Sequence, residues 1–119
     1  MITFIIICIF APYMKVTMDQ DLFELYTTGN NKRYKDVSRN PQLRDGFTRA
    51  VDFMKAAESV EQLKGASFLH YEQLKYQNSG ISSVRLSNSY VHRLLFTENE
   101  TGIELTLIEI DDTHYGNKK

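Results

Sequence analysis

The segment ISSVRLSNSYVHRLLFTENETGIELTLIEI, residues 81–110, is the part of the sequence from which the fold class follows. It contains three runs rich in isoleucine, valine, tyrosine and leucine, at residues 81–86, 90–96 and 103–110. Residues of these types favour strands, and the short polar segments between the runs predict neighbouring antiparallel strands. Two predicted helices precede them. We therefore predict an α+β domain in which a small antiparallel β-sheet packs against two N-terminal helices.

Two arginines occupy matching positions in the first two predicted strands. A turn at residues 88–90 would place Arg85 directly opposite Arg93. Like charges opposed across strands destabilise a hairpin, so the pair is easier to understand if both side chains share an anion. Arginine is suited to bidentate phosphate binding. The alternative is that Arg85 forms a surface ion pair with Glu104 or Glu109, a contact that contributes little stability.

The second strand has two different faces because side chains alternate along a strand. His92, Leu94 and Phe96 share one face, and Arg93 and Leu95 share the other. We expect one face to pack on the helices and the other to line a shallow cleft that holds Arg93. His92 shares its face with apolar residues and is expected to be structural.

The third strand leads to a polar cluster at the end of the chain, formed by Asp112, His114 and Tyr115. Cations, a titratable histidine and a carboxylate are the groups that acid–base chemistry on a phosphodiester requires. Polar residues near a chain end are more often frayed and solvated, and that interpretation stays open.

Capping residues and periodicity predict the helical half of the domain. A short strand is expected at residues 15–18, after which Asp19 can cap a first helix that the segment 28–31 ends. Asn40 opens the main helix, and residues 59–62 form a capping-box pattern for one further turn. The main helix has an apolar stripe with a period of 3.6 residues, formed by Leu43, Phe47, Val51 and Met54.

A basic loop lies between the two predicted helices. Lys32, Arg33 and Lys35 surround Tyr34, which is a weak signal for nucleic-acid binding and more often marks a solvated loop. The net charge of the chain is −1. Any phosphate binding must therefore come from local clustering of basic residues and not from the field of the whole protein.

Length and composition are those of one ordinary globular domain, which we place at residues 14–119 of the 119. The single cysteine, Cys8, excludes an internal disulfide framework and favours a reducing, cytoplasmic location. Residues 2–11 form an apolar run shorter than the ~20 residues that span a bilayer. We interpret residues 1–13 as an upstream extension of the reading frame, with initiation at Met14. A hydrophobic N-terminal strand or a degenerate export signal is the alternative.

The order of several short motifs resembles a known family. They are Leu-His-x-x-x-Leu-Lys at residues 69–75, Ser-Val-Arg at 83–85, Arg-Leu-Leu-Phe at 93–96 and Ile-x-Ile-Asp-Asp-x-His-Tyr at 108–115. Together with the preceding helices they resemble the RelE/ParE superfamily of bacterial toxins, and within it the HigB group, over residues 14–116. The resemblance implies a toxin of a type II toxin–antitoxin system that cleaves mRNA in the ribosomal A site. It also implies a cognate helix-turn-helix antitoxin, HigA-like, as partner.

The resemblance also implies which residues form the site. The catalytic set would be His70, Lys75, Arg85, Arg93, Asp112 and His114. The arginines and Lys75 would hold the phosphate, while His114 or His70 serves as general base or acid and Asp112 orients a histidine or shares the proton transfer. RNA supplies its own 2′-OH nucleophile, so we expect no cofactor and no metal, and no metal-ligand spacing is visible. Lys32, Arg33, Lys35 and Tyr115 would contact RNA, with Tyr115 stacking on a base.

The chain departs from the family pattern at two points. The spacings from His70 to Lys75 and from Arg85 to Arg93 are each about two residues longer than usual. Thr113 stands where the family commonly has an aromatic residue. Two alternatives also stay open: a non-catalytic binding module of the same fold, such as the superfamily members that poison DNA gyrase, or a remnant that keeps only antitoxin binding. Without the resemblance, His70 would be interpreted as a surface residue.

Overall fold

The computed structural model describes residues 14–73, 80–99 and 104–112. Residues 1–13, which we expect to be an upstream extension, lie outside this part of the chain. The described elements are β1 (Lys15–Thr17), α2 (Gln20–Thr28), α3 (Lys35–Arg39), α4 (Pro41–Ala56), α5 (Val60–Gly65), the 3-10 helix η1 (Ser67–Leu69), β2 (Glu72–Gln73), β3 (Ile81–Arg85), β4 (Arg93–Glu98) and β5 (Glu104–Asp111). The predicted α+β class is confirmed.

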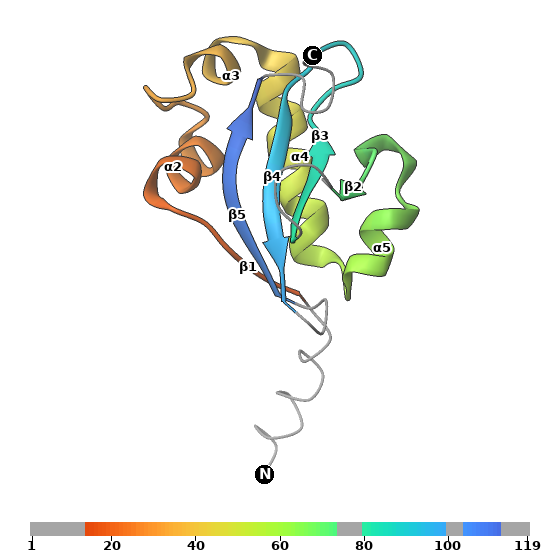
Figure 1. Cartoon of the computed structure of the whole chain (residues 1–119). Coiled ribbons are helices and arrows are strands. Elements are labelled where there is room, and N and C mark those ends of the chain that lie inside the picture. The colour runs from red at the N-terminus through yellow and green to blue at the C-terminus, as the bar shows by residue number, and fades with distance from the viewer. Residues whose placement is uncertain (1–13, 74–79, 100–103, 113–119) are drawn as a thin grey trace.

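The sheet has five strands in the order β1-β5-β4-β3-β2 (Figure 1). β3, β4 and β5 form the predicted antiparallel meander, and the two-residue strand β2 pairs antiparallel with β3. β1 pairs in parallel with β5, with Val16 beside Leu105. The expected first strand is therefore present, but it makes the sheet mixed. A parallel pair needs a long crossover connection, and here the helices and the meander lie between the two strands in the sequence.

The register of β3 and β4 places Arg85 directly opposite Arg93, as the sequence predicts. β4 begins at Arg93 and not at residue 90 as expected. The reason lies in the loop before it, where the backbone N–H of Leu86 donates to the carbonyl of His92 at 3.3 Å. This bond closes a loop that is longer than the predicted turn, although the turn itself lies at residues 88–89.

Local side-chain bonds set the ends of the helices as predicted. Asp19 caps α2 because its Oδ1 accepts from the backbone N–H of Leu22 at 2.9 Å. Gly29 ends α2 with a φ of 78°, a left-handed conformation that glycine adopts without steric cost. Asn40 caps α4 with its Oδ1, which accepts from the backbone N–H groups of Gln42 at 3.0 Å and Leu43 at 3.2 Å.

Two helical details differ from the expectation. The predicted turn after Ser59 is present as α5, but Ser59 makes no side-chain capping bond. The Gln62 side chain reaches back instead and accepts from the backbone N–H of Glu58 at 3.0 Å. α3 is an additional short helix that the sequence did not predict, and Lys35 of the basic loop is its first residue.

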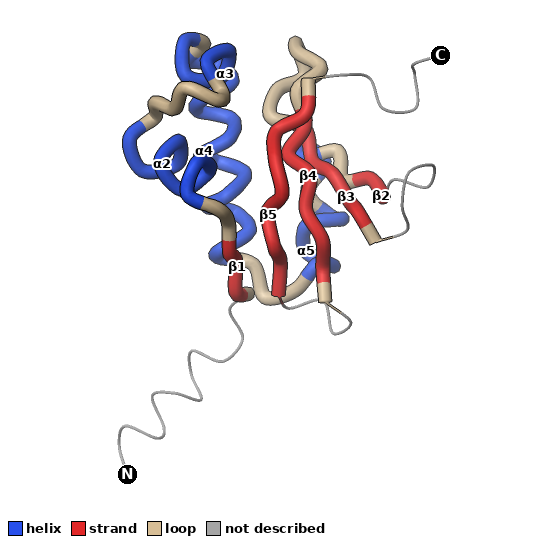
Figure 2. Tube along the Cα trace, turned by 60° about the vertical axis from the view of Figure 1, so that its left-hand side comes forward, coloured by secondary structure: helices blue, strands red, loops and turns tan. Residues whose placement is uncertain are grey.

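The helices cover one face of the sheet. Figure 2 shows α2, α3 and α4 together on one side of β4 and β5. All four residues of the predicted stripe are buried in the core, together with Val84, Leu94, Phe96, Leu105 and Leu107 of the sheet. α4 approaches the end of β3 closely, because a Cβ at Gly46 would lie 1.9 Å from the Leu86 carbonyl oxygen. The opposite face of β3 and β4 is therefore free of these helices.

Candidate functional site

The face of the sheet away from the helices carries the arginine cluster, which we define as Glu72, Ser83, Arg85 and Arg93. Arg93 donates from Nη1 to the Ser83 hydroxyl at 2.9 Å. Its Nη2 lies 3.3 Å from Glu72 Oε1. The strand register brings these groups together, since Glu72 pairs with Ser83 and Arg85 pairs with Arg93.

Arg93 is held more tightly than an ordinary surface arginine. Its side chain is only 17% exposed, whereas that of Glu72 is 56% exposed. Burial lowers the pKa of Arg93, the Glu72 carboxylate opposes this effect, and the neighbouring Arg85 lowers the pKa further. The repulsion expected between the two arginines is thus offset in part by one carboxylate. A phosphate bound between the guanidinium groups would offset it further.

The sequence suggested Glu104 or Glu109 as alternative ion-pair partners of Arg85, but both carboxylates pair with other residues. Glu109 lies 3.4 Å from Arg33, and Glu104 lies 3.8 Å from Lys15. On this face Arg93 forms an ion pair with Glu72. The interpretation of Arg85 as a surface ion pair with Glu104 or Glu109 is therefore wrong.

The other predicted catalytic residues are not all gathered around the arginines. His70 is exposed and follows η1 with a φ of 49°, two residues before Glu72. Asp112 lies next to Asp36 and His92, in a different group described below. Lys75, His114 and Tyr115 lie outside the described residues. The described part of the chain thus brings together Arg85 and Arg93 from the predicted set, with Glu72 added.

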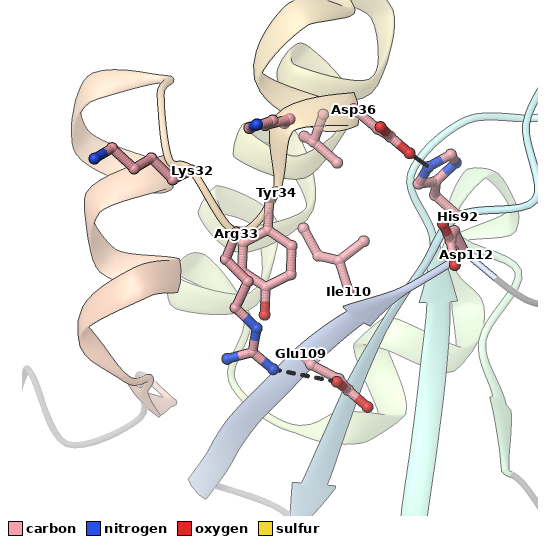
Figure 3. A pocket seen from close by; sticks show the side chains of 10 residues that line it. Lys32, Arg33, Tyr34, Asp36, His92, Glu109, Ile110 and Asp112 are labelled. Atoms are coloured by element: carbon pink, nitrogen blue, oxygen red, sulfur yellow. Dashed lines mark hydrogen bonds and ion pairs between the residues drawn. The ribbon is translucent and has the colours of Figure 1, made fainter.

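A pocket of about 480 Å³ lies on the other side of β4 (Figure 3). It is lined by the basic loop, by the start of α3 and by the ends of β4 and β5: Lys32, Arg33, Tyr34, Lys35, Asp36, Val37, His92, Glu109, Ile110 and Asp112. Three cations and three carboxylates face it, so its charges are balanced. It is not the uniformly basic groove typical of nucleic-acid binding proteins.

Two side chains of the basic loop, Arg33 and Tyr34, already make contacts within the protein. The Arg33 guanidinium lies 3.7 Å from Asp19, 3.7 Å from Asp21 and 3.4 Å from Glu109. Tyr34 is buried, at 7% exposure, so its ring is not available for stacking on a base. Burial is also the main cause that raises the pKa of Tyr34. Lys32 and Lys35 remain exposed.

Glu72 is the site residue that the sequence analysis missed. It lies in a two-residue strand, which is too short to show any periodic pattern. Its position in the site depends on the pairing of β2 with β3, a contact set by the folded sheet. The indication available in the sequence was its place between His70 and Lys75, inside the motif that carries the family resemblance.

Comparisons with known proteins support the fold. The structure is similar to that of a YoeB/ParE toxin from Agrobacterium tumefaciens, with a TM-score of 0.53 and 16% identity, over 84% of this chain and 99% of that one. A YoeB dimer structure from Staphylococcus aureus matches with a TM-score of 0.49 and 17% identity, over 87% of this chain and 99% of that one. No family model and no curated protein sequence matches the chain. Among the described helices, none is long and apolar enough to cross a membrane.

Proposed function

We propose that this chain is the toxin of a type II toxin–antitoxin system, HigB-like in sequence, and that it cleaves mRNA on the ribosome. The observation that carries the proposal is the arginine cluster: two paired arginines beside a carboxylate, on the sheet face that the helices leave free. The resemblance of the sequence motifs to the RelE/ParE superfamily supplies the reaction. The fold shared with a protein described as a YoeB/ParE toxin agrees with it.

The reaction would use the 2′-OH of the RNA itself as nucleophile. Attack on the adjacent phosphorus builds negative charge on the phosphoryl oxygens, and preorganised cations stabilise that charge. Arg93 is fixed by Ser83 and Glu72, and Arg85 lies beside it, so two forked donors would meet one phosphate. Such an arrangement favours the transition state because the donors need little reorganisation during the reaction.

Proton transfer needs a base for the 2′-OH and an acid for the departing 5′-oxygen. Glu72 is a carboxylate that touches an arginine of the cluster, and we assign it to the base, which leaves the role of acid to His70 or His114. His70, Lys75, Asp112 and His114 keep the roles that the family resemblance gives them, and Tyr115 the stacking role. These five assignments rest on the resemblance. Asp112, which lies beside His92, would have to act from a different side of β4.

The partners follow from the same proposal. A toxin of this kind would work in the cytoplasm, bind the ribosome and mRNA, and be neutralised by a HigA-like helix-turn-helix antitoxin. Lys32 and Lys35 are the exposed members of the basic loop and would contact RNA backbone. Arg33 would contribute less, because three carboxylates already surround it.

The test is primer extension on a reporter mRNA in a purified translation system, with the protein started at Met14. Ribosome-dependent cuts that disappear in the variant carrying Arg93→Ala and His114→Ala, with unchanged circular dichroism, would support the nuclease. Intact mRNA with folded wild-type protein would contradict it. In that case the binding module becomes the better hypothesis, and a DNA gyrase cleavage-complex assay is the next measurement.

A further inference from the structure

We propose that Asp36, His92 and Asp112 form a binding site for one divalent transition-metal ion, a site separate from the arginine cluster; one of its members, Asp112, is also a residue that the family resemblance assigns to the proposed nuclease. We call these three residues the Asp-His-Asp cluster. They come from three separate parts of the chain: the first turn of α3, the loop before β4 and the residue after β5. Because the residues are far apart in the sequence, no ligand spacing reveals them.

The geometry of the cluster is that of converging ligands. One ligand atom from each residue lies within 4.8 Å of the others. Figure 3 shows the Asp36 carboxylate directed at the His92 ring, with Asp112 close to the same ring. The distance from His92 Nε2 to Asp36 Oδ2 is 3.8 Å. This distance is longer than a hydrogen bond. The His92 ring and the Asp36 carboxylate therefore face each other but are not hydrogen-bonded.

Within the part of the chain that the structure describes, His92 lacks the hydrogen bonds that a buried imidazole normally makes. Its side chain is only 13% exposed. Both ring nitrogens are shielded from solvent and have no hydrogen-bond partner among residues 14–73, 80–99 and 104–112. Burying such groups unpaired is costly. The ring centroid of Tyr90 lies 6.2 Å from that of His92 in an edge-on packing contact. A metal ion on Nε2 would satisfy one nitrogen and use the carboxylates already directed at it.

The ligand chemistry selects the class of ion. One imidazole with two carboxylates suits zinc and its neighbours, whereas magnesium and calcium prefer oxygen ligands alone. Zinc bonds of about 2.0–2.2 Å place tetrahedral ligand atoms about 3.4 Å apart, so no pair of ligand atoms in the cluster needs to approach by more than about 1.4 Å. Asp36 can supply this movement because its side chain is 69% exposed.

The charges around the cluster balance the ion. Two carboxylates with a neutral imidazole match a divalent cation. Lys32 and Lys35 line the same pocket and oppose cation binding, but both side chains are exposed and screened by solvent. Arg33 is already paired with carboxylates. A bound ion would tie α3 to the ends of β4 and β5, which fixes the point where the chain leaves the sheet toward His114.

The test is calorimetric titration of the purified full-length chain with Zn²⁺ and, separately, with Mg²⁺. We expect one Zn²⁺ per chain and no comparable binding of Mg²⁺. Loss of a ligand should weaken zinc binding by more than about tenfold. Mutation of a residue that only hydrogen-bonds to a metal ligand already lowers metal affinity by about that factor. The variants are Asp36→Asn, which replaces an exposed side chain by an isostere and keeps the fold, and His92→Ala.

The matched control is His70→Ala, which removes a histidine outside the cluster and should leave zinc affinity unchanged. Arg93→Ala should also bind zinc as the wild type does, which separates this proposal from the nuclease. Co²⁺ bound in place of Zn²⁺ should give a visible absorption band that Asp36→Asn abolishes or shifts. Three results would overturn the proposal. They are no zinc binding by the folded wild type, wild-type zinc affinity in both Asp36→Asn and His92→Ala, or an affinity of the wild type for Mg²⁺ equal to that for Zn²⁺.

Discussion

The two faces of β4 differ in what they contact. Leu94 and Phe96 point into the helix-covered core and are fully buried. Arg93 points to the opposite face, where it meets Ser83 and Glu72. Positions 93, 94 and 96 thus serve two purposes, because side chains alternate along a strand. The main effect of a substitution, on stability or on chemistry, should therefore depend on the face that it changes.

The largest effect is expected from Phe96→Ala on the covered face. Phe96 is fully buried, and its ring centroid lies 6.1 Å from that of Tyr71. Removing a buried phenylalanine ring leaves a cavity and should lower the free energy of unfolding by about 3–5 kcal/mol. Denaturant unfolding measures this, with Thr97→Ala on the other face as the control at less than about 1 kcal/mol. Equal losses in the two variants would contradict the division between the faces.

Arg93→Ala is the corresponding change on the open face. Losing a preorganised donor to the phosphoryl oxygens should slow mRNA cleavage by about 10²–10³-fold. The free energy of unfolding should fall by about 1–3 kcal/mol, less than for Phe96→Ala, because the buried Ser83 hydroxyl loses its hydrogen bond while the Glu72 partner is more than half exposed. Single-turnover cleavage on programmed ribosomes measures the rate.

Two further variants sharpen this prediction. Arg93→Lys keeps the charge but not the planar fork, so its rate should fall between those of wild type and Arg93→Ala. Arg39→Ala removes an exposed positive charge from α3 and should leave the rate unchanged. If Arg39→Ala slowed cleavage as much as Arg93→Ala, general charge and not the arginine cluster would be responsible.

Local patterns explain which features could be predicted from the sequence. Asp19 and Asn40 cap helices through bonds to residues two or three positions away, so their roles are visible in short segments. The opposition of Arg85 and Arg93 follows from two adjacent strands joined by one loop. Each of these predictions needed only neighbours in the chain, and each is confirmed.

Features that depend on distant segments could not be predicted. β1 pairs with β5 across most of the chain, so its parallel direction has no local signature. Glu72 reaches Arg93 only through the register of β2 with β3. Asp112 was expected beside the arginines, but Asp111 is the residue that pairs with Arg93, so alternation places Asp112 on the other face, near His92. The register of β4 with β5, and not a local pattern, decides which of the two aspartates shares a face with the arginines.

A smaller effect is expected from Asn40→Ala, which tests the covered face through its longest helix. The side-chain oxygen of Asn40 accepts hydrogen bonds from two backbone N–H groups at the start of α4. Removing this cap should lower the free energy of unfolding by about 1 kcal/mol. Asn40→Asp keeps the acceptor and should change it by only a few tenths of that. Cleavage should be unaffected in both, since α4 packs against the face opposite the arginine cluster.

The smallest effect is expected from a change at Tyr71. Tyr71 packs against the covered core, whereas the next residue, Glu72, lies on the open face. Burial, followed by the hydrogen bond from its hydroxyl to Glu98, raises the pKa of Tyr71 to about 12. In the unfolded chain the pKa is near 10, so the folded state holds this proton more tightly. The contribution to stability is therefore complete below pH 10 and is lost as the pH rises toward 12. Unfolding measured across this range should show a steeper decline in wild type than in Tyr71→Phe, and equal slopes would mean that Tyr71 is not held in this way.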